Sequence, residues 1–207
     1  MEERTYSKRQ AQAAATREQL VQAAHQVFAE RGYTAATVGA ITERANTAHG
    51  TFYLYFRNKD EAFTTVLEDV MFDVHDRVLS FSVEGDLRVR LEHALRGFVG
   101  VFAEHRGVWR SLLEGALTAP GLAETWAEIR AGFNKRVEAV LDELQGAGLV
   151  RPLDSRTTAV ALCAMGEWMA MSQLVISDAS DADREQVLAT MLDVWHHALA
   201  PVHVAVD

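Results

Sequence analysis

His49, Gly50 and Tyr53 lie close together in the chain and offer two hydrogen-bonding groups with a side-chain gap between them. In a helix over about 48–54, at about 100° per residue, the three share one outward arc. The His49 ring and the Tyr53 hydroxyl can hydrogen-bond base edges or phosphates. Because Gly50 has no side chain, a helix carrying it can lie deep in a major groove. The spacing therefore predicts a DNA recognition helix.

Further residues around this arc extend the candidate surface. Ala48 and Phe52 fall on the opposite arc and are expected to point inward. Lys59 opens the following helix, where its ammonium group suits a phosphate contact beside the N-terminal amides. The candidate DNA contacts are Thr37, Thr47, Ala48, His49, Gly50, Thr51, Tyr53, Leu54, Tyr55 and Lys59.

Two short helices joined by a tight turn, after a longer helix, must position this surface. Thr16 and Gln19 form a capping box for a first helix over residues 16–31, and Gly32 supplies its end. The helix can extend back through the Ala-rich residues before it. A mobile basic arm is expected within residues 1–15.

The next elements have clear end signals. Thr37 can cap a short second helix, and Asn46 stands where the chain leaves it, since Asn tolerates the left-handed conformation. Asn58 can cap a long fourth helix, with Glu61 at the reciprocal capping position. This order of helices is typical of a helix-turn-helix.

Residues 45–61, ANTAHGTFYLYFRNKDE, resemble the A-G-V-S-x-G-T-L-Y-x-H-F-x-S-K-E signature of the TetR (tetracycline repressor-like) family. Residues 23–37 are similar to the first helix of that family and its exit. Four positions depart from the signature: Asn46, Thr47, Ala48 and Tyr55. Asn in place of Gly is conformationally harmless, and the tyrosine can still donate to a phosphate. Loss of the usual Ser cap leaves the recognition helix less well capped, with the preceding threonine as the candidate substitute.

The resemblance implies a mechanism as well as a fold. A homodimer would place two recognition helices in successive major grooves of a palindromic operator, about 34–36 Å apart. The rest of the chain would bind a small molecule that changes the separation of the two reading heads. We therefore expect a repressor that a small hydrophobic or aromatic effector releases from double-stranded DNA, although an activator would use the same protein.

The chain after residue 60 is expected to form this regulatory body. Its amphipathic segments lie at about 86–104, 107–117, 121–145, 155–177 and 183–199. The chain holds 3 Pro, the first at position 120, and lacks strand patterns, so the expected fold class is all-α. Residues 1–60 would form a three-helix DNA-binding domain, and residues 61–207 a larger helical bundle for ligand binding and dimerisation.

Aromatic and methionine side chains of this body suit a hydrophobic effector pocket, although each of them alone is more often ordinary core. Glu167 stands out in an apolar helix, where a carboxylate must be paired or hydrogen-bonded. It would either anchor a polar group of the ligand or pair with an arginine across the dimer. The candidate pocket residues are Phe98, Phe102, Trp109, Trp126, Phe133, Met165, Glu167, Trp168 and Met169.

The helix expected over 155–177 is apolar almost all round, so neighbours must cover every side of it. Its small residues allow another helix to approach closely. The resemblance implies that the last two helices form a four-helix dimer interface, and the alternative is the core of a monomer. The candidate interface residues are Ala159, Cys163, Gly166, Ala170, Val187, Met191 and Trp195.

Charge is divided unevenly along the chain. The net charge is −9, but residues 1–59 carry +3 and residues 60–207 carry −12. A basic segment suits DNA, whereas an acidic body is repelled by it. The division therefore supports a two-part regulator.

Other function classes lack their signatures. Cys163 is the only cysteine, which fits a reducing cytoplasm, and the N-terminus lacks the apolar region of a signal peptide. Glu167 interrupts the richest apolar run, so we expect no membrane partner. Phosphate loops, nucleophile elbows and metal-ligand spacings are missing, so we expect no enzyme, no cofactor and no metal. The rival function is a helical protein-binding adaptor without sequence-specific DNA binding.

Overall fold

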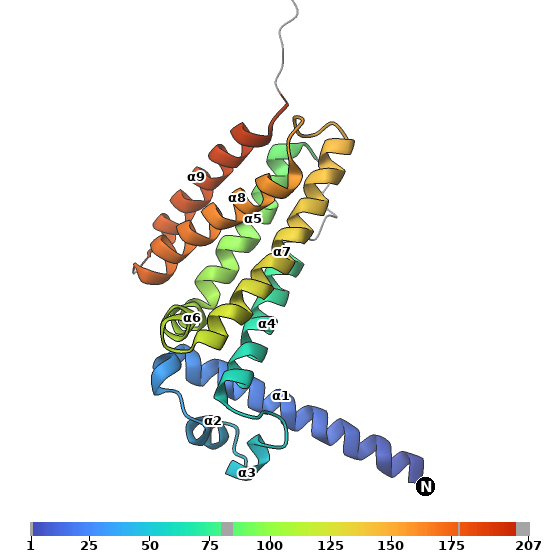
Figure 1. Ribbon diagram of the computed structural model, residues 1–207, viewed down its shortest axis with the longest axis vertical. Coiled ribbons are helices and arrows are strands. Elements are labelled where there is room, and N and C mark those ends of the chain that lie inside the picture. The colour runs from blue at the N-terminus through green and yellow to red at the C-terminus, as the bar shows by residue number, and fades with distance from the viewer. Residues whose placement is uncertain (1, 80–84, 178, 202–207) are drawn as a thin grey trace, which may run out of the picture. The chain divides into compact units, whose positions relative to one another are not determined.

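The computed structural model describes residues 2–79, 85–177 and 179–201 of the chain. Within these residues every regular element is a helix, which confirms the expected all-α fold (Figure 1). The elements are α1 Glu2–Ala35, α2 Val38–Arg44, α3 His49–Phe52, α4 Lys59–Leu79, α5 Leu87–Glu104, α6 Arg106–Thr118, α7 Pro120–Gly146, α8 Ser155–Ala170, the π-helix η1 Met171–Ile176 and α9 Asp181–Leu199.

α1 is longer than the expected first helix. Its backbone is helical from Glu2, so the expected arm is helical in its backbone, while the side chains of residues 2–9 lie outside the described part. The capping box expected at Thr16 is wrong, because the Thr16 hydroxyl donates to the carbonyl oxygen of Gln12 at 3.0 Å inside the helix. The helix is interrupted where expected, at Gly32, with φ 79° and ψ 171°.

The end signals of α2 are confirmed. Thr37 Oγ1 accepts the backbone N–H of Ala40 at 3.1 Å, as an N-cap residue does. Asn46 has φ 49° where the chain leaves α2. α3 is a single turn, shorter than the expected 48–54, because Ala48 is its extended N-cap residue and Tyr53 is its C-cap residue.

The chain folds into two compact units, each discontinuous in sequence. The first unit comprises Met1–Asp69 and Gly107–Thr125, and the second comprises Val70–Arg106 and Trp126–Asp207. α6 therefore belongs to the unit that holds the helix-turn-helix. The functional boundary expected at residue 60 stays a prediction.

Aromatic side chains form the core of the first unit. The Phe63 ring lies 4.6 Å from that of Phe28 and 5.3 Å from that of Tyr33, between centroids. Phe52 from α3 and Trp109 from α6 are fully buried. Aromatic side chains bury about 150–250 Å² each, so this cluster supplies much of the hydrophobic stabilisation of the unit.

One face of α6 lies against the C-terminal half of α1. A Cβ at Gly107 would lie 2.4 Å from the carbonyl oxygen of Ala29, so only glycine allows this approach. One turn later, Ser111 Oγ donates to the carbonyl oxygen of Phe28 at 2.7 Å. After another turn, a Cβ at Gly115 would lie 3.0 Å from the Tyr33 ring and 2.5 Å from Leu122.

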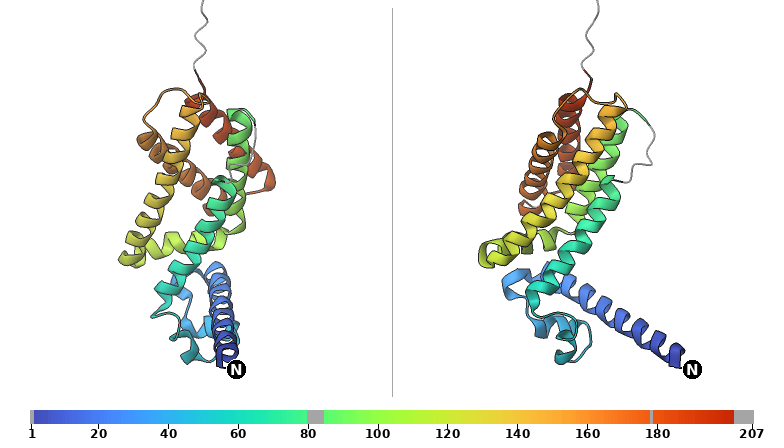
Figure 2. Two further views of the ribbon diagram at one scale, coloured as in Figure 1. Left: turned by 90° about the vertical axis from the view of Figure 1, so that its right-hand side faces the viewer. Right: turned by 45° about the vertical axis from the view of Figure 1, so that its right-hand side comes forward.

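In the second unit α5 and α8 both contact α9 (Figure 2). Gly166 allows α8 to approach α9 closely, since a Cβ there would lie 3.1 Å from the Trp195 ring. η1 continues α8, and Arg106 holds its C-terminal end. The Arg106 Nε donates to the carbonyl oxygen of Val175 at 3.2 Å, and its guanidinium also donates to that of Ser177.

Among the residues placed by the structure, the continuous helix Ser155–Ile176 is long and apolar enough to cross a membrane by length and composition alone. The apolar run is therefore longer than expected from the interruption at Glu167. A core helix of a soluble protein passes the same test, and 39% of the most apolar window is buried inside the protein.

Gly107→Ala should destabilise the protein, because its methyl group would meet the backbone of Ala29 rather than a flexible side chain. We expect a loss of roughly 1–3 kcal/mol in the free energy of unfolding, as for other overpacked sites. Gly132→Ala in α7 is the matched control, since a Cβ there has nothing within 4 Å. This control should stabilise by about 0.5–1 kcal/mol. Urea unfolding followed by circular dichroism measures both, and equal midpoints would contradict the close approach.

Candidate nucleic-acid interface and regulatory sites

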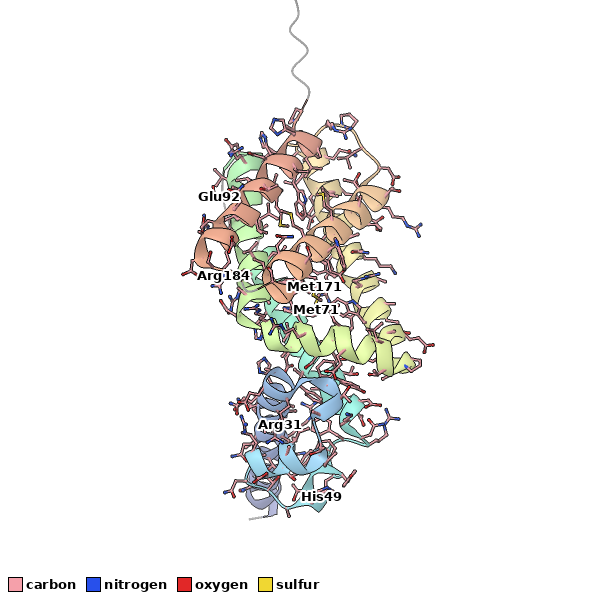
Figure 3. The ribbon with its side chains drawn as sticks, turned by 90° about the vertical axis from the view of Figure 1, so that its left-hand side faces the viewer. Arg31, His49, Met71, Glu92, Met171 and Arg184 are labelled. Atoms are coloured by element: carbon pink, nitrogen blue, oxygen red, sulfur yellow. The ribbon has the colours of Figure 1, made fainter. Side chains whose placement is uncertain are left out.

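The α3 turn presents the expected arc to solvent (Figure 3). His49 and Gly50 are exposed, and Tyr53 keeps 53% of its surface accessible. The His49 and Tyr53 rings lie 5.5 Å apart, between centroids. Phe52 is fully buried, as expected, and anchors the turn in the core. The structure therefore brings the three residues of the arc together.

The start of α3 differs from the expectation. Ala48 is exposed rather than inward, because it is the N-cap residue and precedes the helix. No side chain caps α3. The substitute cap expected of Thr47 is wrong, because its hydroxyl is buried without a hydrogen-bond partner in the described part of the chain.

Gly50 is surrounded by open space. A Cβ there would have no atom within 4 Å, so packing inside the protein does not require glycine. Glycine inside a helix costs about 0.5–1 kcal/mol relative to alanine. The missing side chain at this position therefore leaves the α3 surface open to close approach by a partner.

Lys59 is turned toward its own unit. Its Nζ lies 2.9 Å from the carbonyl oxygen of Tyr33, 3.3 Å from that of Ala36 and 3.5 Å from that of Thr34. The same atom lies 4.6 Å from the centre of the Tyr33 ring. The phosphate contact expected of Lys59 stays a prediction, and this geometry does not favour it.

The remaining expected contacts surround α3. Leu54 is 79% exposed, Thr37 is exposed, and Thr51 and Tyr55 are half-buried. Arg57 is an exposed cation that sequence reasoning missed, with 88% of its side chain accessible. The sequence feature that could have identified it is its place as a basic residue between the recognition helix and α4.

The start of α4 is capped as expected, with one difference. Asn58 Oδ1 accepts the backbone N–H of Glu61 at 2.9 Å. The Glu61 carboxylate accepts the backbone N–H of Arg57 at 2.7 Å and its Nε–H at 3.0 Å, rather than the Asn58 N–H. These hydrogen bonds hold the pKa of Glu61 below its usual value. They also fix the backbone of Arg57 beside the candidate surface.

Glu167 is paired within its own chain. Its Oε1 accepts from the indole N–H of Trp126 at 3.3 Å and from Arg130 at 3.4 Å. Its side chain is 19% exposed. Both partners lie on α7 of the same chain, and the pairing considered across a dimer stays a prediction.

The structure does not bring all of the candidate pocket residues, the expected effector wall, together. The Phe98 and Phe102 rings lie 4.6 Å apart, whereas Trp109 is buried in the first unit. Met165 and Trp168 are exposed, the latter by 65%. The half-buried members are Phe98, Trp126, Phe133, Glu167 and Met169.

A groove outside this wall lies between α5 and α9 and encloses about 250 Å³. Arg96 on its rim is paired with Glu185 at 3.1 Å, and Arg184 is paired with Asp181 at 3.0 Å. The charges on the rim are thus already matched within the chain. The lining residues are Arg96, Val99, Gly100, Ala103, Glu104, Arg184, Glu185 and Leu188, and none was expected from the sequence.

Most of the expected dimer residues are used inside the chain. Gly166 faces Trp195 and Met191, which lie 3.1 and 3.2 Å from the position that a Cβ would take. The buried members are Ala159, Gly166, Ala170, Val187 and Met191. An apolar stripe on the other side of α8 is exposed instead, at the helical spacing i, i+1, i+4, i+5 and i+8. It consists of Val160, Ala161, Ala164, Met165 and Trp168, and Val194 is exposed on α9.

Cys163 lies four residues before Glu167 on α8. Burial, and then the charge of that carboxylate, raise the pKa of the thiol to about 12. The residues with a described placement include no group of three or more His, Cys, Asp or Glu that could hold a metal ion. The geometry therefore gives this thiol the character of a small apolar side chain.

Two family models match the chain. Residues 20–65 match the model described as "Bacterial regulatory proteins, tetR family". Residues 91–200, more than half of the chain, match the model of the C-terminal domain of the transcriptional regulator EthR. The first match contains the α3 surface, and the second contains most of α5 and all of α8 and α9.

Relatives and solved structures agree with these matches. The chain is 36% identical over 61 residues to the HTH-type transcriptional regulator YvdT of Bacillus subtilis, and 29% identical over 133 residues to the fatty acid metabolism regulator protein of that species. These matches cover 30% and 62% of this chain, and 31% and 63% of the relatives, so less than two thirds of either relative is matched. A solved TetR-family regulator from Rhodococcus sp. has the same fold, with a TM-score of 0.77 and 19% identity over 90% of this chain and 100% of that one.

The Cys163 thiol should react slowly with iodoacetamide at pH 8, because the thiolate is the nucleophile and a pKa of about 12 leaves little of it. We expect a rate at least about 100-fold below that of free cysteine, whose pKa is about 8.5. Glu167→Gln should raise the rate, since it removes a charge that opposes the thiolate. The protein unfolded in guanidinium is the control and should react at the free rate. Rapid labelling of the folded protein would show that the thiol is not protected.

Proposed function

Since the chain belongs to the TetR family of bacterial transcriptional regulators, we propose that it represses transcription by binding a palindromic operator as a homodimer. A small hydrophobic or aromatic effector releases it. The observation that carries this proposal is the exposed α3 arc, where His49 and Tyr53 flank the open space at Gly50. No observation favours the alternative function as a protein-binding adaptor. Regulators of this family are not enzymes.

The α3 surface supplies groups for both base and phosphate contacts. The His49 ring and the Tyr53 hydroxyl hydrogen-bond base edges, and Leu54 offers an apolar contact to a thymine methyl group. Thr37 and Arg57, at the edges of the surface, bind phosphates and fix the register on the duplex. Thr51 and Tyr55 complete this rim, with residues 1–60 as the DNA-binding domain.

The exposed stripe on α8 supports dimerisation through the last helices. Trp168, 65% exposed in the single chain, is the largest apolar side chain of the stripe. Exposed apolar patches of this kind mark protein interfaces, and Trp is enriched among the residues that dominate them. A second copy of the chain covers the stripe, with Val194 of α9 at its edge.

The half-buried part of the aromatic wall supports an apolar effector site in residues 61–207. Phe98, Trp126 and Phe133 offer ring surface, and Glu167 with Arg130 offers one charged pair for a polar group of the ligand. One relative is named for fatty acid metabolism, in line with an apolar effector. The site of action is the cytoplasm, where the chromosome of a bacterium lies.

Gly50→Ala should separate DNA binding from stability. We expect the thermal midpoint to be unchanged or higher, because alanine favours helix and has open space there. Operator affinity should fall by at least about tenfold, because the new methyl group would hold α3 away from the bases, and one bidentate hydrogen-bonded pairing with a base is worth about 1–3 kcal/mol. Tyr53→Ala should weaken binding similarly, and Gly132→Ala in α7 is the matched control. Fluorescence anisotropy with an operator duplex measures the affinity, and full affinity in both α3 variants would refute the DNA-reading role.

Trp168→Glu should dissociate the dimer while leaving each chain folded, since the side chain is exposed in the single chain. Truncation of a central interface Trp costs at least about 2 kcal/mol, or roughly 30-fold in the dimer dissociation constant. Leu117→Glu is the matched control, because Leu117 is 88% exposed but lies outside the stripe. Sedimentation equilibrium measures the dimer constant. A dimer of unchanged strength in Trp168→Glu would place the interface elsewhere.

A further inference from the structure

In residues 32–36, α1 breaks and the chain turns toward α2. The carbonyl groups of this segment accept hydrogen bonds from the ammonium group of Lys59. The Lys59 ammonium lies 2.9 Å from the carbonyl oxygen of Tyr33, 3.3 Å from that of Ala36 and 3.5 Å from that of Thr34. The last carbonyl groups of a helix have no partner within it. The three N–H donors of Lys59 therefore match three carbonyl acceptors at and just after the end of α1.

The backbone amide groups of the same segment donate hydrogen bonds to a carboxylate. Glu114 of α6 accepts the backbone N–H of Tyr33 at 2.8 Å and that of Thr34 at 3.2 Å, one with each carboxylate oxygen. The positive φ of Gly32 turns these amides out of the helix, and a Cβ on Gly32 would lie 2.6 Å from the Glu114 carboxylate. Hydrogen bonds from Thr34 and Tyr33, and the charge of Lys59, hold the pKa of Glu114 below its usual value.

The Tyr33 side chain ties this segment to the start of α4. Its hydroxyl donates to Asp60 Oδ1 at 2.6 Å, and its ring lies beneath the Lys59 ammonium at 4.6 Å. Burial and the bond to Asp60 raise the pKa of Tyr33. The next residue after the segment is Thr37, the N-cap of α2, so the path of residues 32–36 sets the direction in which the helix-turn-helix begins.

We propose that Lys59 and Glu114 are positioning residues for DNA binding, which hold residues 32–36 from opposite sides so that α2 and α3 keep the orientation that a groove requires. The proposal rests on the proposed function as a DNA-binding repressor. It gives Lys59 a role through the backbone of its own unit, in place of a phosphate contact. It also makes α6 a part of the DNA-reading unit, although α6 lies outside the helix-turn-helix sequence.

Salt dependence separates the two roles of Lys59. Each phosphate neutralised by a lysine contributes about 0.9 to the slope of log affinity against log salt. Lys59→Met should weaken binding by at least about tenfold at every salt concentration while the slope stays the same. Lys135→Met, an exposed lysine on α7, is the matched control and should change neither quantity. The probe is a fluorescent duplex enriched by the wild-type protein from a random-sequence pool, titrated between 50 and 200 mM salt, roughly the range over which this effect is large. A slope shallower by about 0.9 would overturn the proposal for Lys59.

The direction of the change in DNA affinity separates a positioning role of Glu114 from simple electrostatic repulsion. Removing an anion near polyanionic DNA strengthens binding if nothing else changes. Glu114→Ala should instead weaken binding by at least about fivefold, because the amides of Tyr33 and Thr34 lose their acceptor. Glu114→Gln keeps a carbonyl acceptor and should recover part of the affinity. Glu124→Gln, an exposed carboxylate at the start of α7, is the matched control and should bind as wild type or slightly better. Unchanged or tighter binding by Glu114→Ala overturns the proposal for Glu114.

Amide hydrogen exchange tests the contact without DNA. The Tyr33 and Thr34 amides should exchange at least about tenfold faster in Glu114→Ala than in wild type, while the Phe28 amide inside α1 keeps its rate. Unaltered exchange at both amides would overturn the proposal. If Glu114→Ala does not fold, the same comparison is made with Glu114→Gln, which should show a smaller increase. If the wild-type protein enriches no duplex, the proposed function fails, and the exchange result still decides whether Glu114 holds this segment.

Discussion

The interruption of α1 at Gly32 is the constraint on which the helix-turn-helix unit depends. A helix that stops inside a packed unit leaves carbonyl and amide groups that must find partners, because orphaned buried backbone groups are costly. Here the partners are not neighbours in sequence. They come from the first residue of α4 and from α6, which reaches α1 only because Gly107 permits close backbone contact and Ser111 bonds to Phe28. Close packing of α6 against α1 therefore brings Glu114 within reach of the break.

Local signals allowed the caps and turns of this unit to be predicted from the sequence. Thr37 and Asn58 accept backbone N–H groups three residues ahead, and Asn46 adopts the left-handed conformation, because each depends only on adjacent residues. The Thr16 capping box failed for a related reason. The residues before it are good helix formers, and propagation of an existing helix is easier than starting one, so α1 continues through that position.

The directions of long side chains could not be predicted in this way. Lys59 stands where a phosphate-binding lysine would stand, but its ammonium finds three carbonyl groups more than twenty residues away in sequence. In the second unit, the composition of α8 predicts a dimer-interface helix, yet its Gly166 meets α9 of the same chain and its exposed stripe lies on another side. Composition indicates that a helix must be covered on every side, whereas tertiary packing decides which partner covers each side.

The long sequence separation between the α1 break and Glu114 has a consequence for the synthesis of the protein. Glu114 follows Thr34 by 80 residues, so the amides leave the ribosome well before their acceptor. At about 5–20 residues per second this delay is roughly 4–16 s. During that interval the nascent helix-turn-helix lacks α6 and the carboxylate acceptor that α6 supplies. Because residue 114 lies in the second half of the 207-residue chain, the amides of Tyr33 and Thr34 lack this acceptor until more than half of the protein has been synthesised.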